Sequence, residues 1–143
     1  PSRGLGDVYK RQYLDIVGLT KYKSYYPKQL SSSMLQRVSI ARAFATEPEL
    51  LLMDEPYGQL DIELRFKLED ELIKLWEMTK TTVIFITHNI EEAAYLGNRV
   101  MILTNKPTTV KRTVNNTLPR PRDIASPDFV ALRTEVTDAI KWW

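Results

Sequence analysis

The sequence of 143 residues contains no cysteine, a single histidine and no long run of apolar residues. Without cysteine the chain forms no disulfide bond and offers no thiolate to a metal ion, which suits a reducing compartment. Because no apolar run approaches the length of a bilayer-spanning helix, we expect a soluble domain whose role at any membrane is peripheral. The formal net charge of +2 is too small to indicate a nucleic-acid partner, and none is predicted.

The chain is long enough, and with 43% hydrophobic residues apolar enough, to bury the core of one domain. Residues 1–12 read PSRGLGDVYKRQ and show neither a helical nor a strand period, and we interpret them as a foreign or disordered leader. The orderly pattern of residues 13–114 predicts the main folded domain. Residues 115–143 are predicted to form a stiff linker, LPRPRD, and a C-terminal helix that opens at Pro127.

Hydrophobic periodicity predicts an alternation of strands and helices. Apolar residues recur at helical spacing from Met34 to Ala45 and again over 62–79, and continuous apolar runs of strand length precede Asp54 and His88. Continuous apolar character indicates strands that are buried on both faces, as in a parallel sheet. The remaining predicted elements are a short helix over IEEAAYL, strands over 98–103 and 108–114, and the C-terminal helix. The predicted fold class is therefore α/β, with a mostly parallel sheet and packed helices.

Two of the predicted strands end in side chains that carry chemistry. Asp54 and Glu55 close the first apolar run and His88 follows the second, and ligands of such sheets bind at the carboxyl ends of strands. An Asp-Glu pair at the end of a buried strand is costly unless a cation or a hydrogen-bond donor faces it. We interpret Asp54 as holding Mg²⁺ through water, Glu55 as a general base, and His88 as a contact to a phosphate. The alternatives are solvated acids at the start of a loop and a structural histidine.

Three consecutive serines, Ser31, Ser32 and Ser33, precede the first strong helix. A serine hydroxyl accepts a hydrogen bond from the free N–H groups of the first helical turn, and this capping role alone accounts for one serine. Hydroxyls and unpaired N–H groups at the positive end of a helix also form an anion site. From these residues alone, helix capping and phosphate binding both remain open.

Four motifs occur in one order at short separations: LSSSMLQRVSIARA, LLLMDEP, GQLD and VIFITHN. From about Tyr13 onward the chain resembles the C-terminal half of an ABC transporter ATPase subunit, a P-loop NTPase that uses ATP and Mg²⁺. The resemblance implies that Ser31 contacts the γ-phosphate of ATP bound to the opposite subunit of a head-to-tail dimer. Backbone N–H groups near Ser32 and Ser33 would complete that cradle, and Gln36 and Arg37 match the Gln-Arg that follows the signature.

The resemblance also implies roles for the other motifs. Asp54 matches the aspartate that holds Mg²⁺, Glu55 the catalytic base and His88 the switch histidine. In the family a loop links the two sites across the dimer, and the residues that match it here are Gly58, Gln59, Leu60 and Asp61.

The sequence departs from the family pattern in several places. Ser32 and Ser33 stand where the family has glycine, and Gln59 stands where it has a small alanine. Glycine lets the backbone approach a ligand or adopt positive φ, so slow or absent hydrolysis is one expectation. The G-x-x-x-x-G-K-[ST] phosphate loop and the family's first strands are missing from the sequence. We therefore expect the chain alone to be marginally stable and to hydrolyse no ATP.

The C-terminal segment indicates a subgroup of the family. LPRPRD and SPDFVALRTEV resemble the end of ATPases from importers of nitrate, sulfonate, taurine and bicarbonate. The resemblance implies a subunit on the cytoplasmic face of the membrane, with an integral permease docked near residues 13–29 and a solute-binding protein as an indirect partner. The alternatives are a degenerate subunit that dimerises without hydrolysing ATP, and a soluble ABC ATPase of DNA repair or translation.

Overall fold

The structure is a computed structural model that describes residues 11–58 and 62–141. The chain forms two compact units, which divide between Ile86 and Thr87. This boundary falls just after the second predicted strand, and the sequence pattern did not indicate it. The domain ranges expected from the sequence, 13–114 and 115–143, stay a prediction.

The first described residues of this unit form a helix that ends near Gly18. Residues 11–16 are helical, and Gly18 has φ +66°, a left-handed conformation that glycine adopts at little cost. The N–H of Leu19 donates to the carbonyl of Leu14 over 2.7 Å and closes the helix end. The polar connector that follows contains two short 3-10 helices, η1 (Thr20–Tyr22) and η2 (Pro27–Gln29).

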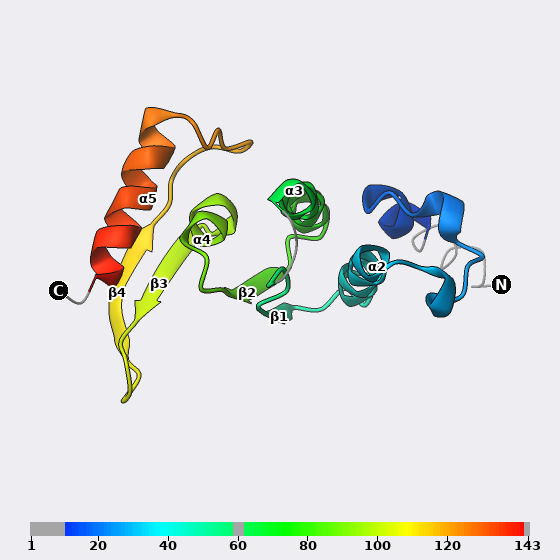
Figure 1. Cartoon of the computed structure of the whole chain (residues 1–143), viewed down its shortest axis with the longest axis horizontal. Coiled ribbons are helices and arrows are strands. Elements are labelled where there is room, and N and C mark those ends of the chain that lie inside the picture. Colours follow the sequence, from blue (N-terminus) through cyan, green and yellow to red (C-terminus); the bar gives the residue numbers. More distant parts are fainter. Residues whose placement is uncertain (1–10, 59–61, 142–143) are drawn as a thin grey trace. The chain divides into compact units, whose positions relative to one another are not determined.

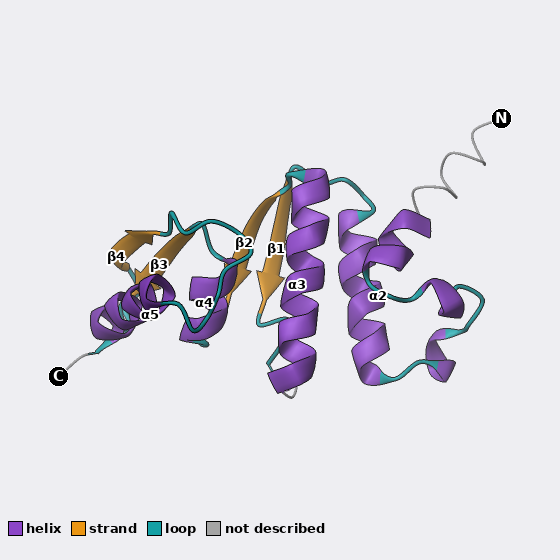
Figure 2. Cartoon of the chain, turned by 90° about the horizontal axis from the view of Figure 1, so that it is seen from above, coloured by secondary structure: helices purple, strands orange, loops and turns teal. Residues whose placement is uncertain are grey.

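Two longer helices of the first unit, α2 (Ser32–Phe44) and α3 (Ile62–Thr79), lie side by side (Figure 2). Both ranges agree with the helical periodicity of the sequence. Each helix contributes apolar side chains to the core, and Phe44, Leu68 and Leu75 have no exposed surface. Burying one such side chain contributes about 1.5–3 kcal/mol, so these core residues are a main source of stability for the unit.

The first unit also holds a parallel pair of strands, β1 (Leu50–Asp54) and β2 (Thr82–Ile86). Both strands and their parallel pairing confirm the prediction. The expected burial on both faces is wrong, because alternate side chains of the two strands are exposed. Among the described residues only the face that carries Met53 and Phe85 is covered, with the Phe85 ring 5.6 Å from that of Tyr57. The side chains of the opposite face are 44–67% exposed: Leu50, Leu52, Ile84 and Ile86.

The second unit contains α4 (Ile90–Leu96), β3 (Arg99–Leu103), β4 (Val110–Asn115) and α5 (Pro127–Ile140). α5 lies along the β3–β4 pair (Figure 1), and its buried Phe129 and Val136 contribute to the core of this unit. The α/β class is confirmed, but β3 and β4 pair antiparallel, because a loop of only six residues joins them. Within the described ranges, no helix has both the length and the apolar character needed to cross a membrane.

Candidate functional site

The carboxyl end of β1 carries the two acids that the sequence singled out. Asp54 is the last residue of the strand, Glu55 is the next residue, and both are exposed. Glu55 has φ +44°, a conformation that costs a residue other than glycine about 1–3 kcal/mol. Its N–H donates to the carbonyl of Ile86 over 2.9 Å, so the contact between the two strands continues past the end of β1. Strained backbone of this kind gathers at functional sites, which marks Glu55 as a candidate.

Tyr57 anchors the turn that follows Glu55. The Tyr57 hydroxyl donates to the carbonyl of Leu68 in α3 over 3.2 Å, and its ring packs on Phe85 of β2. The N–H of Gly58 donates to the carbonyl of Glu55 over 3.3 Å and closes the turn. These contacts fix the backbone beside the two acids. The rest of the predicted loop between the sites, Gln59, Leu60 and Asp61, lies outside the described residues.

Ser31 is the N-cap of α2. Its Oγ accepts the N–H of Met34 over 3.3 Å and lies 3.0 Å from the Oγ of Ser33. Capping is therefore confirmed for Ser31, while phosphate binding by the three serines stays a prediction. Ser32 and Ser33 both lack positive φ, so α2 as it stands does not require glycine at either position.

His88 is an exposed residue of the second unit, directly ahead of α4. The residues on either side of it are held firmly. Asn89 Oδ1 accepts the N–H groups of Glu91 and Glu92 over 2.9 Å and 3.3 Å, as the N-cap of α4. The Thr87 hydroxyl donates to Glu92 Oε2 over 2.6 Å and accepts the N–H of Asn89 over 3.0 Å. The backbone that carries His88 is thus fixed relative to the first turn of α4.

The structure brings together only some of the predicted site residues. Asp54 and Glu55 adjoin each other in the first unit, whereas His88 belongs to the second, so the predicted closeness of all three stays a prediction. Mg²⁺ is usually held by one or two protein carboxylates together with waters and substrate phosphates, and the exposed Asp54 carboxylate suits that role. Within the part of the chain that the structure describes, no cluster of three or more His, Cys, Asp or Glu side chains could hold a metal ion.

A buried charge pair, which the sequence did not predict, joins α2 to α3. Arg37 Nε lies 3.6 Å from Glu71 Oε2, and the two side chains are 12% and 7% exposed. Burial raises the pKa of Glu71, and the nearby positive charge of Arg37 opposes this shift. Glu71 follows Leu68 by three residues on the apolar stripe of α3, and an acid at such a position is the signal that would have found it.

Arginines from the segment predicted as a linker close the C-terminal end of α4. Arg122 is 6% exposed, and its Nη1 donates to the carbonyls of Ala94, Tyr95 and Gly97 over 3.2, 2.6 and 2.9 Å. Arg120 Nη1 donates to the Tyr95 carbonyl over 3.2 Å. Burial lowers the pKa of Arg122 to about 10, which leaves it charged at neutral pH. A positive charge at a helix C-terminus satisfies the free carbonyls and the helix dipole, so this segment is part of the packed unit.

Comparison with known proteins shows which family this chain resembles. A sequence model described as ABC transporter matches residues 10–58. An uncharacterized ABC transporter ATP-binding protein of Methanocaldococcus jannaschii is 44% identical over 131 residues, which are 92% of this chain and 49% of that protein. The chain thus resembles ABC transporter ATP-binding proteins over most of its own length.

Two further ABC proteins extend the comparison. An aliphatic sulfonates import ATP-binding protein of Bacillus thuringiensis subsp. konkukian is 44% identical over 126 residues, covering 88% of this chain and 50% of that relative. A solved ABC transporter structure in an inward-facing conformation matches with a TM-score of 0.61 and 25% identity, over 90% of this chain and 48% of the other. These findings confirm the predicted family resemblance and the predicted partial ABC ATPase fold. The chain spans about half the length of the curated relatives it matches.

Proposed function

We propose that the chain is part of the ATP-hydrolysing subunit of an ABC importer, and that this subunit drives uptake of an aliphatic sulfonate or a similar small anion. The observation that carries the proposal is the strained Glu55 beside Asp54 at the carboxyl end of β1, in a chain that resembles ABC transporter ATP-binding proteins. The identity to an aliphatic sulfonates import protein supports the solute class. The tail motifs LPRPRD and SPDFVALRTEV point to the same group of importers.

The roles we propose follow the chemistry of each side chain. Asp54 holds Mg²⁺ through water, and the ion offsets negative charge on the phosphates of ATP. Glu55 accepts the proton of the attacking water, since an exposed carboxylate next to the metal position is a suitable general base. His88 donates a hydrogen bond to the γ-phosphate. These three residues carry the hydrolysis step.

The serines are proposed to act on ATP that is bound by a second subunit. Ser31 accepts the Met34 N–H, and a hydroxyl that accepts one hydrogen bond can still donate its proton. If Ser33 donates to Ser31, the Ser31 proton is available for a phosphate oxygen. Capping and phosphate binding are therefore compatible at Ser31, and the N-terminal end of α2 adds its dipole.

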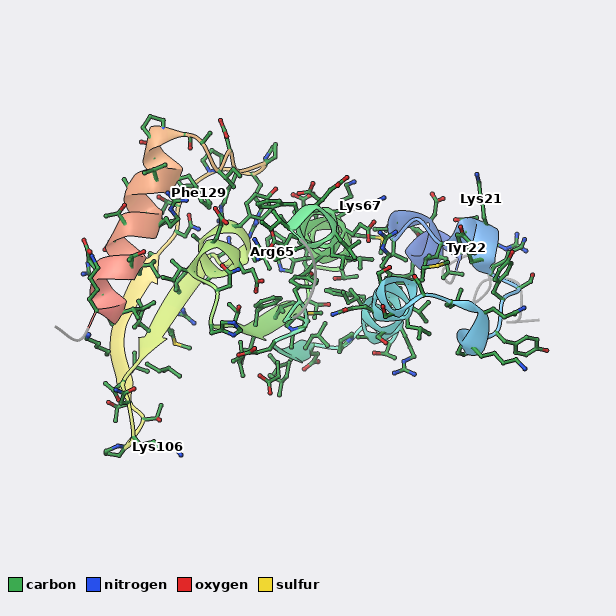
Figure 3. All side chains as sticks on the ribbon, in the orientation of Figure 1. Lys21, Tyr22, Arg65, Lys67, Lys106 and Phe129 are labelled. Carbon is green, nitrogen blue, oxygen red and sulfur yellow. The ribbon has the colours of Figure 1, made fainter. Side chains whose placement is uncertain are left out.

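The proposed membrane partner is an integral permease that docks on the connector ahead of α2. Three tyrosines of this segment are exposed, by 39% for Tyr22, 51% for Tyr25 and 70% for Tyr26. The rings of Tyr22 and Tyr25 meet edge to face, 5.2 Å apart, and Lys21 and Tyr22 project from η1 (Figure 3). Exposed aromatic side chains are typical anchors of protein interfaces, which supports this segment as the docking surface.

The test is reconstitution of the complete subunit with its permease and solute-binding protein in proteoliposomes. We expect Mg²⁺-dependent ATP hydrolysis that is stimulated by an aliphatic sulfonate, and weaker stimulation by nitrate or bicarbonate. ATP binding without hydrolysis would instead support the alternative of a degenerate, non-hydrolysing subunit, which the serines at positions 32 and 33 suggest. Hydrolysis that does not respond to any of these solutes would contradict the proposed solute class.

A further inference from the structure

The C-terminal helix α5 contacts α4 at both ends of that short helix. The ring of Phe129 lies 6.4 Å from that of Tyr95, edge to face, near the C-terminal end of α4. Arg133 Nη1 lies 3.4 Å from Glu91 Oε1, in the first turn of α4. Because Phe129 and Arg133 are four residues apart, as are Tyr95 and Glu91, the two contacts lie one helical turn apart on both helices. The two helices therefore run antiparallel and in register.

The two contacts differ in what they contribute. Phe129, labelled in Figure 3, has no exposed surface and belongs to the core of the second unit. The Arg133 and Glu91 side chains are 41% and 29% exposed. An ion pair this exposed contributes little to folding, because water screens it and two long side chains must be ordered. Loss of this pair is therefore expected to leave the second unit folded, so its effect on the first turn of α4 can be measured.

The first turn of α4 is the support of His88. Asn89 accepts the backbone N–H groups of Glu91 and Glu92, and Thr87 donates to the side chain of Glu92, so displacement of this turn carries His88 with it. α4 has only seven residues, and a helix of that length depends on packing to hold its position. An open pocket of about 440 Å³ adjoins this turn and leaves room for such a displacement. It is lined by His88, Asn89, Ile90, Glu91, Arg133 and Thr137.

We propose that Arg133 is a positioning residue for His88, which it holds in place through Glu91 and the first turn of α4. This inference rests on the proposed function, in which His88 contacts the γ-phosphate. The SPDFVALRTEV segment of the tail then has a mechanical role in hydrolysis, because it carries both Phe129 and Arg133. The Thr137 hydroxyl, which donates to the Arg133 carbonyl over 2.7 Å, supports α5 one turn further along.

The test compares Arg133→Gln with Arg112→Gln in the complete subunit assembled with its permease. Arg112 pairs with Glu135, so its loss also removes an ion pair of α5, but one that joins that helix to β4. We expect Arg133→Gln to lower kcat about threefold to tenfold with little change in KM, and Arg112→Gln to leave both unchanged. Arg133→Lys should restore most of the rate, because it keeps the positive charge. Arg133→Gln in a Glu91→Gln background should cause no further loss.

A spectroscopic measurement decides the inference separately from the proposed function. The ¹³C-labelled histidine signals of the complete subunit are recorded, and the His88 signal is the one that disappears in His88→Gln. We expect this signal to shift or broaden in Arg133→Gln and to stay in place in Arg112→Gln. An unmoved His88 signal in Arg133→Gln overturns the inference, and so does a moved signal with an unchanged kcat. If the unsubstituted subunit hydrolyses no ATP, the proposed function fails, and the signal alone then decides whether Arg133 positions His88.

Discussion

The N–H of Glu55 donates to the carbonyl of Ile86 over 2.9 Å, one residue beyond the last paired position of β1. This bond holds Glu55 at φ +44° at the carboxyl end of the parallel strands. The neighbouring Asp54 ends the strand in regular geometry. The two adjacent acidic residues thus differ in backbone conformation. This difference is consistent with two different proposed roles, metal binding by Asp54 and proton abstraction by Glu55.

The first prediction concerns the cap of α2. Ser31→Ala removes the oxygen that accepts the Met34 N–H, and we expect it to lower the free energy of unfolding by about 1 kcal/mol. Under the proposed function it also raises the KM for ATP in the assembled transporter, because the phosphate contact is lost. Urea unfolding and steady-state ATPase measurements check the two effects. Ser39→Ala, on the exposed side of the same helix, is the matched control. An unchanged KM would leave Ser31 with a capping role alone.

The second prediction concerns the serines at the family's glycine positions. Ser32 and Ser33 occupy the first turn of α2 without positive φ. Changing either to glycine should destabilise the helix by about 0.5 kcal/mol, because glycine loses more backbone entropy on folding. We expect a lower thermal midpoint for the Ser32→Gly/Ser33→Gly subunit in a melting curve. If the same variant gains ATPase activity severalfold, then the serines are the cause of slow hydrolysis.

The third prediction is a pH dependence that arises from Glu71. Burial raises its pKa in the folded state above the ordinary value of 4.5. The native state therefore binds the proton more tightly, so the stability contributed by Glu71 is fully present below pH 4.5 and is lost as pH rises through the raised pKa. We expect Glu71→Gln to lack this part of the pH dependence. Urea titrations at a series of pH values test it, with the exposed Glu77→Gln as control. Parallel pH profiles for Glu71→Gln and the unsubstituted protein would contradict the assignment.

The fourth prediction concerns the arginine that closes the end of α4. Arg122→Met removes three hydrogen bonds from a buried charged group to the carbonyls of α4 and Gly97. We expect a loss of about 2–3 kcal/mol in the free energy of unfolding. Arg112→Met, which removes an exposed arginine of the same unit, should cost less than about 1 kcal/mol. Urea unfolding measures both losses. Equal losses in the two variants would show that the buried Arg122 stabilises the unit no more than an exposed arginine does.

The fifth prediction concerns the membrane partner. Tyr26 is 70% exposed, so Tyr26→Ser should leave the thermal midpoint of the subunit unchanged. We expect it to reduce co-purification with the permease, since an exposed tyrosine at an interface is a frequent hot spot. Leu103→Ser, at a side chain that is 52% exposed on β3, should leave co-purification intact. Full recovery of the permease with Tyr26→Ser would place the docking surface elsewhere.

Periodicity and caps predicted the helices well. The bounds of α3 matched the expected range over 62–79, and α5 begins at Pro127 as predicted, because its N-terminal signals are local. Features that depend on distant residues were not predictable in this way. Leu52 and Ile84 are exposed because no described residue covers that face of the strand pair. An apolar run in the sequence does not show whether another element covers a face.

The residues of the candidate site also include some that the sequence predicted and some that it did not. Asp54 and Glu55 were found from their place after an apolar run, but the positive φ of Glu55 depends on its bond to Ile86. Glu71 and Arg122 were missed, because a charged residue in the sequence does not show whether its neighbours in space bury it.

The central claim is tested most directly by the ATPase rate of the Glu55→Gln variant in the complete, permease-bound subunit. The substitution keeps the size of the side chain, but the amide that replaces the carboxylate cannot accept a proton from the attacking water. We predict that hydrolysis falls by about 100-fold or more, while Mg²⁺-dependent ATP binding is retained. A Glu55→Gln subunit that hydrolyses ATP at the unsubstituted rate would contradict the account.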